Sequence, residues 1–184
     1  RALGLDAGRR TLLVMGGSQG AAGINRLLAE AAPELRCLDL QVIHLSGRQD
    51  AEKMRAAYAE AGLVAAVLPF CDKMQDVYAA ADLVISRSGA ASLTELSWFG
   101  LPAVLVPYPH AAEDHQTLNA RIFERAGAAR IFPEKDASGA SLAAMLKSLL
   151  SSGASLESMA AAAKSLAPRD AAKRVAGVLT HANR

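Results

Sequence analysis

Six short aliphatic segments, none alternating between apolar and polar residues, recur along this 184-residue chain. They are residues 11–15, 40–45, 64–68, 83–86, 103–106 and 129–132, and a run with helical periodicity follows each of the first five. Strands that are apolar on both faces and separated by helices indicate a parallel sheet covered on both sides. The sequence therefore predicts an α/β fold, a doubly wound, Rossmann-like parallel sheet of about six strands.

Helices are expected between these strands and after the last of them. The predicted ranges are 22–35, 50–61, 74–81, 91–99 and 116–126, followed by two or three alanine-rich helices with a break near Pro168. Gly62 and the run Gly100-Leu101-Pro102 are typical helix stop signals. Because no repeat or linker interrupts the pattern, we expect residues 1–184 to form a single domain.

Composition excludes several classes of protein. No apolar run approaches the roughly 18 residues that span a bilayer, and the N-terminus lacks a signal-peptide pattern. A net charge of only +2 argues against an extended nucleic-acid surface, so no nucleic-acid partner is expected. Cys37 and Cys71 fall in different segments, and reduced thiols in a cytoplasmic protein are expected rather than a disulfide.

The segment Ser86-Arg87-Ser88-Gly89-Ala90-Ala91-Ser92-Leu93-Thr94-Glu95 carries the strongest functional signal. A strand that turns through small residues into a helix leaves the first backbone N–H groups of that helix unpaired, and these groups attract an anion such as a diphosphate. Glu95 lies about five residues into the helix, roughly 7.5 Å along its axis. A carboxylate there can accept hydrogen bonds from a ribose diol, although an ordinary surface glutamate is the alternative.

A second glycine-rich turn, Gly16-Gly17-Ser18-Gln19-Gly20, follows the first predicted strand. Glycines let a backbone approach a phosphate closely, and the Ser18 hydroxyl adds a donor. The spacing is not G-x-G-x-x-G, and no Lys-Ser/Thr pair completes a P-loop. A plain tight turn is therefore the alternative. A phosphate-binding role is favoured because we expect this turn to face the same crevice as the helix start after the fourth strand.

Other polar residues follow the remaining strands. Arg87 ends a strand, where it can contact a diphosphate or form a structural ion pair with a nearby Asp. Asp114 is a candidate cap for the helix after the fifth strand, which would aim His115 and Gln116 from the first turn toward the crevice, where such groups suit sugar hydroxyls. The histidines and acids of this loop match no familiar metal-site spacing, and no metal is expected.

Signals for nucleophilic catalysis are poor. The sequence contains no G-x-S-x-G elbow, and neither cysteine has a credible neighbouring base. The run Phe70-Cys71-Asp72-Lys73-Met74, after the third strand, can present backbone groups and an apolar surface to a base. We therefore interpret the unusual residues as a binding site rather than a catalytic constellation.

Three motifs together carry a family resemblance: Gly-Gly-Ser-Gln-Gly, Ser-Arg-Ser-Gly-Ala-x-x-x-x-Glu and Pro-Tyr-Pro-His-x-x-x-x-His-Gln-x-x-Asn-Ala. In order and spacing the chain resembles the C-terminal half of the MurG family, bacterial UDP-N-acetylglucosamine transferases that make lipid II. The resemblance implies one half of a two-domain GT-B glycosyltransferase, with this half holding the UDP-sugar donor. It also implies transfer of GlcNAc to lipid I with inversion in peptidoglycan synthesis, at the cytoplasmic face of the bacterial inner membrane.

The resemblance assigns roles to matched positions. Ser18 and Gln19 would lie beside the diphosphate and sugar. Backbone groups of Cys71 would contact the uracil edge, with Met74 near it. Arg87 would lie beside the donor.

Five further positions complete the implied donor site. Backbone N–H groups of Ala90 and Ala91 would bind the phosphates, and Glu95 would hold the ribose hydroxyls. His115 and Gln116 would contact the GlcNAc hydroxyls, although some relatives carry Gln-Gln at these two positions.

The resemblance also implies what lies outside this chain. The family's N-terminal domain, expected to be absent here, carries the acceptor site, the favoured general base and the main membrane-facing patch. No catalytic residue and no cofactor are therefore expected in this chain, which would bind UDP-GlcNAc weakly and transfer nothing alone. Lipid I and the membrane surface would be partners of the two-domain protein.

Two other classes of function stay open on the sequence. One is another GT-B enzyme, such as a UDP-GlcNAc 2-epimerase or a glycolipid glycosyltransferase. The other is a non-catalytic nucleotide-binding module or an NAD-dependent domain. An NAD site predicts an acidic residue at the end of the second strand, where this chain has His44-Leu45-Ser46-Gly47.

Overall fold

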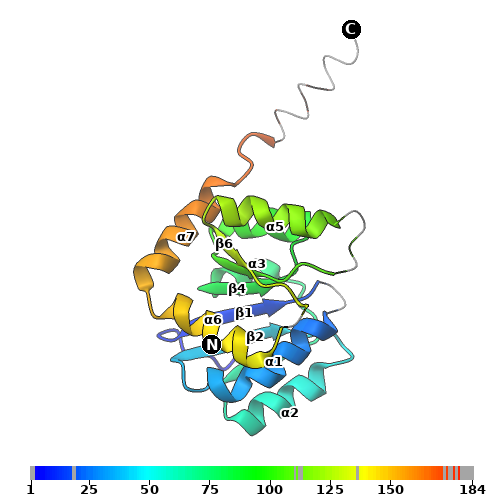
Figure 1. Cartoon of the computed structure of the whole chain (residues 1–184), viewed down its shortest axis with the longest axis vertical. Coiled ribbons are helices and arrows are strands. Elements are labelled where there is room, and N and C mark those ends of the chain that lie inside the picture. The colour runs from blue at the N-terminus through cyan, green and yellow to red at the C-terminus, as the bar shows by residue number, and fades with distance from the viewer. Residues whose placement is uncertain are drawn as a thin grey trace.

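The computed structural model describes residues 3–17, 20–109, 111, 114–135, 137–171, 173, 176 and 178. All strand pairs among these residues are parallel, and they form one six-stranded sheet in the order β3-β2-β1-β4-β5-β6. The strands are β1 (Arg10–Met15), β2 (Leu40–Leu45), β3 (Ala65–Leu68), β4 (Leu83–Ser86), β5 (Ala103–Leu105) and β6 (Ala129–Ile131). Figure 1 labels β2, β1, β4 and β6 in this order across the sheet, and β5 lies between β4 and β6. The predicted fold class is confirmed.

A helix follows each strand, and one more closes the series. The helices are α1 (Ala22–Leu35), α2 (Ala51–Ala61), α3 (Met74–Ala79), α4 (Ala90–Phe99), α5 (His115–Arg125), α6 (Gly139–Leu150) and α7 (Gly153–Ser165). The expected bounds hold within one or two residues, and the expected break near Pro168 follows the end of α7. Across the described part of the chain, no helix combines the length and apolar character needed to cross a bilayer.

The strand order reverses between β1 and β4, and this determines where a ligand can bind. Met15 at the end of β1 pairs with Leu45 at the end of β2 and with Ser86 at the end of β4. The three strands therefore end level, and the loops that leave them start from one edge of the sheet. In open parallel sheets, ligands bind in the crevice outside the strand ends at such a reversal.

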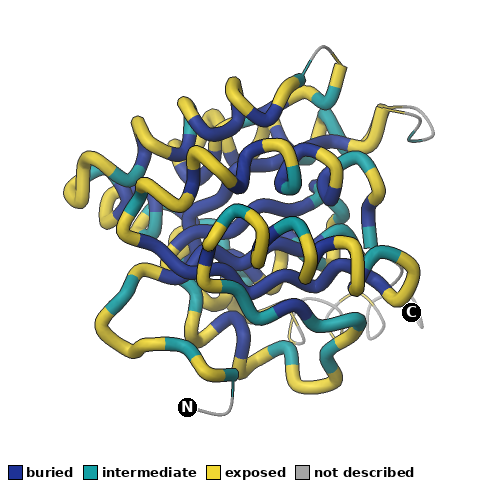
Figure 2. Tube along the Cα trace, turned by 90° about the horizontal axis from the view of Figure 1, so that it is seen from below, coloured by how far each residue is buried: buried dark blue, intermediate teal, exposed yellow. Residues whose placement is uncertain are grey.

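Alternate residues of β1 face the two layers of helices. Leu12 and Val14 belong to a core shared with α1, α2 and α6, whereas Leu13 and Met15 pack in a second core with α3, α4 and α5. All six residues of β2 are buried, as are all four of β4. Figure 2 shows buried strands between helices whose outer sides are exposed. Burial on both faces explains why these strands show no alternation in sequence.

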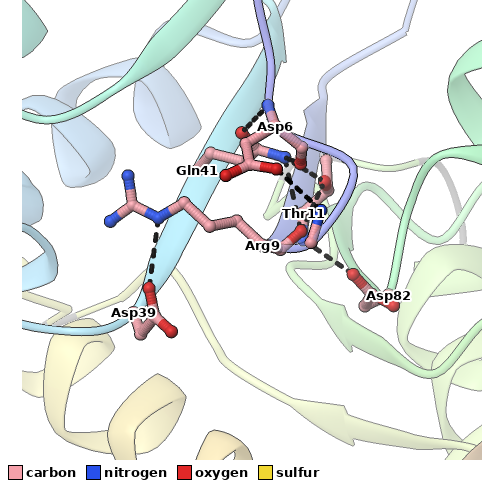
Figure 3. Close-up of polar contacts among 7 residues, drawn as sticks. Asp6, Arg9, Thr11, Asp39, Gln41 and Asp82 are labelled. Carbon is pink, nitrogen blue, oxygen red and sulfur yellow. Dashed lines mark hydrogen bonds and ion pairs between the residues drawn. The ribbon is translucent and has the colours of Figure 1, made fainter.

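The amino edge of the sheet is held by a compact set of polar contacts (Figure 3). The Gln41 side chain, 1% exposed, donates to the backbone oxygens of Asp6 and Arg9 and to Thr11 Oγ1. Asp82 Oδ2 accepts from the Thr11 backbone N–H at 2.7 Å. These groups satisfy one another and join the chain before β1 to the starts of β1, β2 and β4. This edge therefore has a structural role, opposite the crevice.

A buried histidine links three elements beneath the crevice. The Asn25 amide nitrogen, on α1, donates to Ser46 O at 2.9 Å and to Asp50 Oδ2 at 2.7 Å. Its oxygen therefore accepts, from His44 Nε2 at 3.0 Å. The other ring nitrogen, Nδ1, must then accept the hydrogen bond from the Tyr58 hydroxyl at 2.7 Å. This network fixes neutral His44 and joins β2 to α1 and α2.

The neutral form of His44 predicts a loss of stability in acid. Burial lowers the pKa of His44 from 6.5 to about 4, opposed by the nearby Asp50 charge. The unfolded chain takes up a proton below about pH 6.5, so stability falls as the pH falls from there toward 4. We expect this group to reduce the free energy of unfolding by about 2 kcal/mol between about pH 7 and pH 5. Urea denaturation of wild type and His44→Gln at both pH values measures this fall in the free energy of unfolding. The variant should lack the part that is due to His44. An equal fall in both proteins would contradict the assignment.

Candidate functional site

A cavity of about 360 Å³ opens at the carboxyl ends of β1, β2 and β3. Cys71 contributes from the loop after β3, Met74 and Tyr78 from α3, and Ser92 and Glu95 from α4. The full lining is Met15, Gly17, Leu45, Pro69, Phe70, Cys71, Asp72, Met74, Tyr78, Ser92 and Glu95. Three of the predicted donor-site residues, Cys71, Met74 and Glu95, thus line one cavity.

The lining of this cavity combines apolar side chains with a tyrosine hydroxyl and a carboxylate. Met15, Leu45 and Met74 give it apolar walls, and Phe70 beside them is 52% exposed. In the same lining, the Tyr78 hydroxyl donates to Glu95 Oε2 at 2.6 Å. A flat apolar group and a hydroxyl-bearing group would be accommodated side by side. Cys71 is a free, half-buried cysteine, so its thiol takes no part in a disulfide.

The N-terminus of α4 lies at the same edge of the sheet. The helix begins at Ala90 after Gly89, which makes no side-chain capping hydrogen bond, and its first turn contains no acidic residue. Ala90 and Ala91 are both exposed. The first N–H groups and the positive end of the helix dipole are therefore available to an anion. Ser92 and Glu95, further along the helix, line the cavity.

The glycine loop after β1 is partly explained by packing alone. A Cβ on Gly16 would overlap Ala21, and one on Gly20 would overlap the Ser46 carbonyl. The Gly20 backbone N–H donates to Gly17 O at 3.0 Å, which brings these two glycines together. Gly17, with φ of +96°, faces open space and lines the cavity. Ser18 and Gln19 lie outside the described residues, so their predicted contacts stay predictions.

Arg87 is held by several neighbours. Its Nη1 lies 2.6 Å from Glu134 Oε2 and donates to the backbone oxygens of Val106 and Pro107. Its guanidinium carbon lies 5.3 Å from the centre of the Tyr108 ring, within cation–π range. The structural ion pair that the sequence left open is thus present, with Glu134 rather than an Asp. A contact between Arg87 and a diphosphate stays a prediction.

Glu134 also lies against the start of α1. A Cβ on Gly23, the second residue of that helix, would overlap the Glu134 carboxylate. A carboxylate beside a helix N-terminus is favoured by the helix dipole. Glu134 therefore offsets the charge of Arg87 and faces the start of α1, which has no side-chain cap and no acid in its first turn.

His115 and Gln116 form the first turn of α5, as predicted. Asp114 precedes them at the capping position with φ of 53°, but its side chain makes no capping hydrogen bond. Gln116 Oε1 accepts from the Tyr108 backbone N–H at 3.0 Å, and Gln116 O accepts from Ser88 Oγ at 2.7 Å. Gln116 therefore joins the loop after β4 to the loop after β5.

The predicted residues thus form two adjoining groups rather than one lined pocket. Glu95, Cys71 and Met74 line the cavity, while Arg87 and Gln116 belong to the polar contacts around Tyr108. In sequence, the first turn of α4 lies between Arg87 of the second group and Glu95 of the first. Among the residues that the structure describes, no three His, Cys, Asp or Glu side chains are placed to hold a metal ion.

Sequence reasoning missed Tyr78 and Glu134. Tyr78 had a usable signal, because it lies four residues after Met74 on α3 and so shares its face. No signal in the sequence pointed to Glu134, because its proximity to Arg87 depends on the arrangement of β4 and β6 across the sheet.

Known proteins match this chain in sequence and in structure. The family model for the glycosyltransferase family 28 C-terminal domain matches residues 11–175. A UDP-N-acetylglucosamine--N-acetylmuramyl-(pentapeptide) pyrophosphoryl-undecaprenol N-acetylglucosamine transferase of Pseudomonas paraeruginosa is 46% identical over 171 residues, 91% of this chain and 48% of that protein. The crystal structure of Acinetobacter baumannii MurG superposes with a TM-score of 0.86 at 35% identity, covering 94% of this chain and 52% of the other.

A more distant structure shares the fold alone. A putative UDP-N-acetylglucosamine 2-epimerase from Listeria monocytogenes has a TM-score of 0.67 at 13% identity, covering 94% of this chain and 45% of the other. The chain spans about half the length of the curated relatives it matches. Since the family model covers most of the chain and close relatives share its sequence, the chain belongs to glycosyltransferase family 28, as a C-terminal domain of MurG type.

Proposed function

We propose that this chain is the donor-binding half of an inverting GT-B N-acetylglucosaminyltransferase that converts lipid I to lipid II in peptidoglycan synthesis. The names of its curated relatives support the reaction and both substrates. The observation that carries the site is that Glu95 shares the lining of one cavity with apolar side chains and lies on α4, the helix whose uncapped start is Ala90. Base, ribose and diphosphate can be bound in that order along one path.

In the proposed complex, the uracil lies between Met74 and Phe70, and backbone groups of Cys71 contact its polar edge. The ribose hydroxyls donate to Glu95. The diphosphate lies at the start of α4, where the N–H groups of Ala90 and Ala91 point toward it. Each contact uses groups that line the cavity or begin the helix beside it.

Beyond the diphosphate, the sugar lies toward the start of α5, where His115 and Gln116 contact its hydroxyls. The family resemblance assigns Ser18 and Gln19 to the diphosphate and sugar as well. Arg87, held between Tyr108 and Glu134, lies beside the donor.

The proposed chemistry is direct displacement at the anomeric carbon by the acceptor hydroxyl. Negative charge develops on the departing UDP, and the α4 N-terminus with Arg87 stabilises it. This half also holds the anomeric carbon in line for attack. The general base, the lipid I site and the surface that contacts the inner face of the cytoplasmic membrane are assigned to the N-terminal domain of the two-domain, peripheral protein.

The structure offers no observation that favours an epimerase over a glycosyltransferase. Its solved representative resembles this chain at 13% identity, which speaks to the fold only. The family 28 model and the relatives above 40% identity favour glycosyl transfer.

Isothermal titration of the chain with UDP-GlcNAc, UDP-GalNAc, UDP-Glc and NAD tests this function. We expect UDP-GlcNAc to bind most tightly of the three UDP-sugars. NAD should give no detectable heat of binding. His115→Ala should reduce the ratio between the affinities for UDP-GlcNAc and UDP-GalNAc by about tenfold and leave UDP affinity unchanged, because the part of the donor that His115 is proposed to contact is the sugar. Tighter binding of NAD than of UDP-GlcNAc would refute the donor assignment.

A further inference from the structure

We propose that Tyr78 is a positioning residue, which holds the Glu95 carboxylate in the orientation that accepts the ribose hydroxyls. The inference rests on the proposed function, because it assigns a partner to the residue placed against the ribose. Among the described residues, Tyr78 is the hydrogen-bond partner of Glu95, through Oε2 at 2.6 Å. Both side chains line the same cavity, from α3 and α4.

The Tyr78 ring is fixed by its surroundings. It is 3% exposed, its hydroxyl lies 3.5 Å from Met15 Sδ on β1, and its ring centre is 5.2 Å from that of Phe99 at the end of α4. A ring packed against a strand and a helix has one orientation, so the position of its hydroxyl oxygen is fixed as well. Glu95, by contrast, is an exposed side chain that would otherwise sample several rotamers.

The hydroxyl of Tyr78 remains a donor over the whole physiological range. Burial raises the pKa of Tyr78 above its ordinary value, and the hydrogen bond and charge of Glu95 raise it further. The phenol therefore stays protonated and donates continuously to Glu95. An ionised carboxylate has about four lone-pair positions, so one hydrogen bond from tyrosine leaves acceptor capacity for a ribose diol.

Preordering of Glu95 should improve affinity only for ligands that carry ribose hydroxyls. Ordering one flexible side chain during binding costs up to about tenfold in affinity. Without the Tyr78 hydroxyl, the ligand must order Glu95 itself. A ligand without ribose hydroxyls makes no use of that carboxylate and should not sense the change.

The test compares UDP with 2′,3′-dideoxyuridine 5′-diphosphate on wild type and Tyr78→Phe, by isothermal titration. Tyr78→Phe removes one oxygen and keeps the ring. We expect it to weaken UDP by about five- to tenfold and the dideoxy ligand by less than about twofold. In a Glu95→Ala background, Tyr78→Phe should leave UDP affinity unchanged, because its effect passes through Glu95.

Tyr58→Phe provides a matched control. Tyr58 is buried to a similar degree, donates a hydrogen bond to His44 at 2.7 Å and lies on α2, outside the cavity lining. It should lower stability without altering the preference for UDP over the dideoxy ligand.

The outcomes separate this inference from the proposed function. If Tyr78→Phe weakens both ligands equally, or neither, Tyr78 has no positioning role. If Tyr78→Phe weakens UDP as strongly without Glu95 as with it, the role does not pass through Glu95, and the inference is wrong. If wild type binds UDP and the dideoxy ligand equally, the ribose contact itself is wrong and the proposed site fails with it.

Discussion

Glu95→Ala should weaken binding of UDP and of every UDP-sugar by about 150-fold or more. The proposed site places two ribose hydroxyls on this carboxylate, and each hydrogen bond to a charged group contributes about 1.5–3 kcal/mol. Glu95→Gln keeps the shape but removes the charge, and about tenfold weaker binding is expected. Isothermal titration at fixed ionic strength measures both variants.

The matched control is Glu60→Ala, which removes an exposed glutamate from α2, outside the cavity lining. It should leave nucleotide affinity unchanged. Because Glu95→Ala leaves the buried Tyr78 hydroxyl without its carboxylate acceptor, its melting temperature should fall by a few degrees, whereas that of Glu60→Ala should stay close to wild type. Equal affinities for UDP in Glu95→Ala and Glu60→Ala would remove Glu95 from the site.

Gly20→Ala should destabilise the fold by about 3 kcal/mol or more. Gly20 has φ of +80°, which costs an alanine about 1–2 kcal/mol. The added Cβ would also overlap the Ser46 carbonyl, whose oxygen already accepts from Asn25 Nδ2. Since the overlap is with backbone, the loop after β2 must move, and urea denaturation should show the loss.

Gly89→Ala is the comparison for that variant. Gly89 has φ of −68°, and a Cβ added there would have nothing within 4 Å. We therefore expect Gly89→Ala to change the free energy of unfolding by less than about 1 kcal/mol. If both alanine variants had similar stability, the close approach of Gly20 to Ser46 would be wrong.

Much of this fold was predictable because its determinants are local. The unbroken apolar runs of β1, β2 and β4 indicated strands buried on both sides, and Gly62 and Gly100 in the left-handed conformation end α2 and α4 as expected. The exact ends were less predictable. Asp114 occupies the capping position of α5 without making the side-chain bond, because its backbone is left-handed there.

The site was predictable where a residue's position follows from its element. Glu95 and Cys71 lie where strand ends and helix starts place them, so both line the cavity. Partners that arrive from elsewhere in the sequence were not predictable. The Arg87–Glu134 pair and the hydrogen bond from Ser88 Oγ to Gln116 O join different elements after folding, and no spacing in the sequence records them.

In the proposed function, loops at the carboxyl edge of the sheet together bind a uridine diphosphate sugar. A titration of the ¹⁵N-labelled chain with UDP, followed through backbone amide signals, shows which edge of the sheet binds the nucleotide. We predict saturable shifts at Cys71, Ala90, Ala91 and Glu95, with Thr11 and Gln41 at the opposite edge unchanged. Saturable shifts confined to the Thr11 edge, or no shifts at any ligand concentration, would contradict the claim.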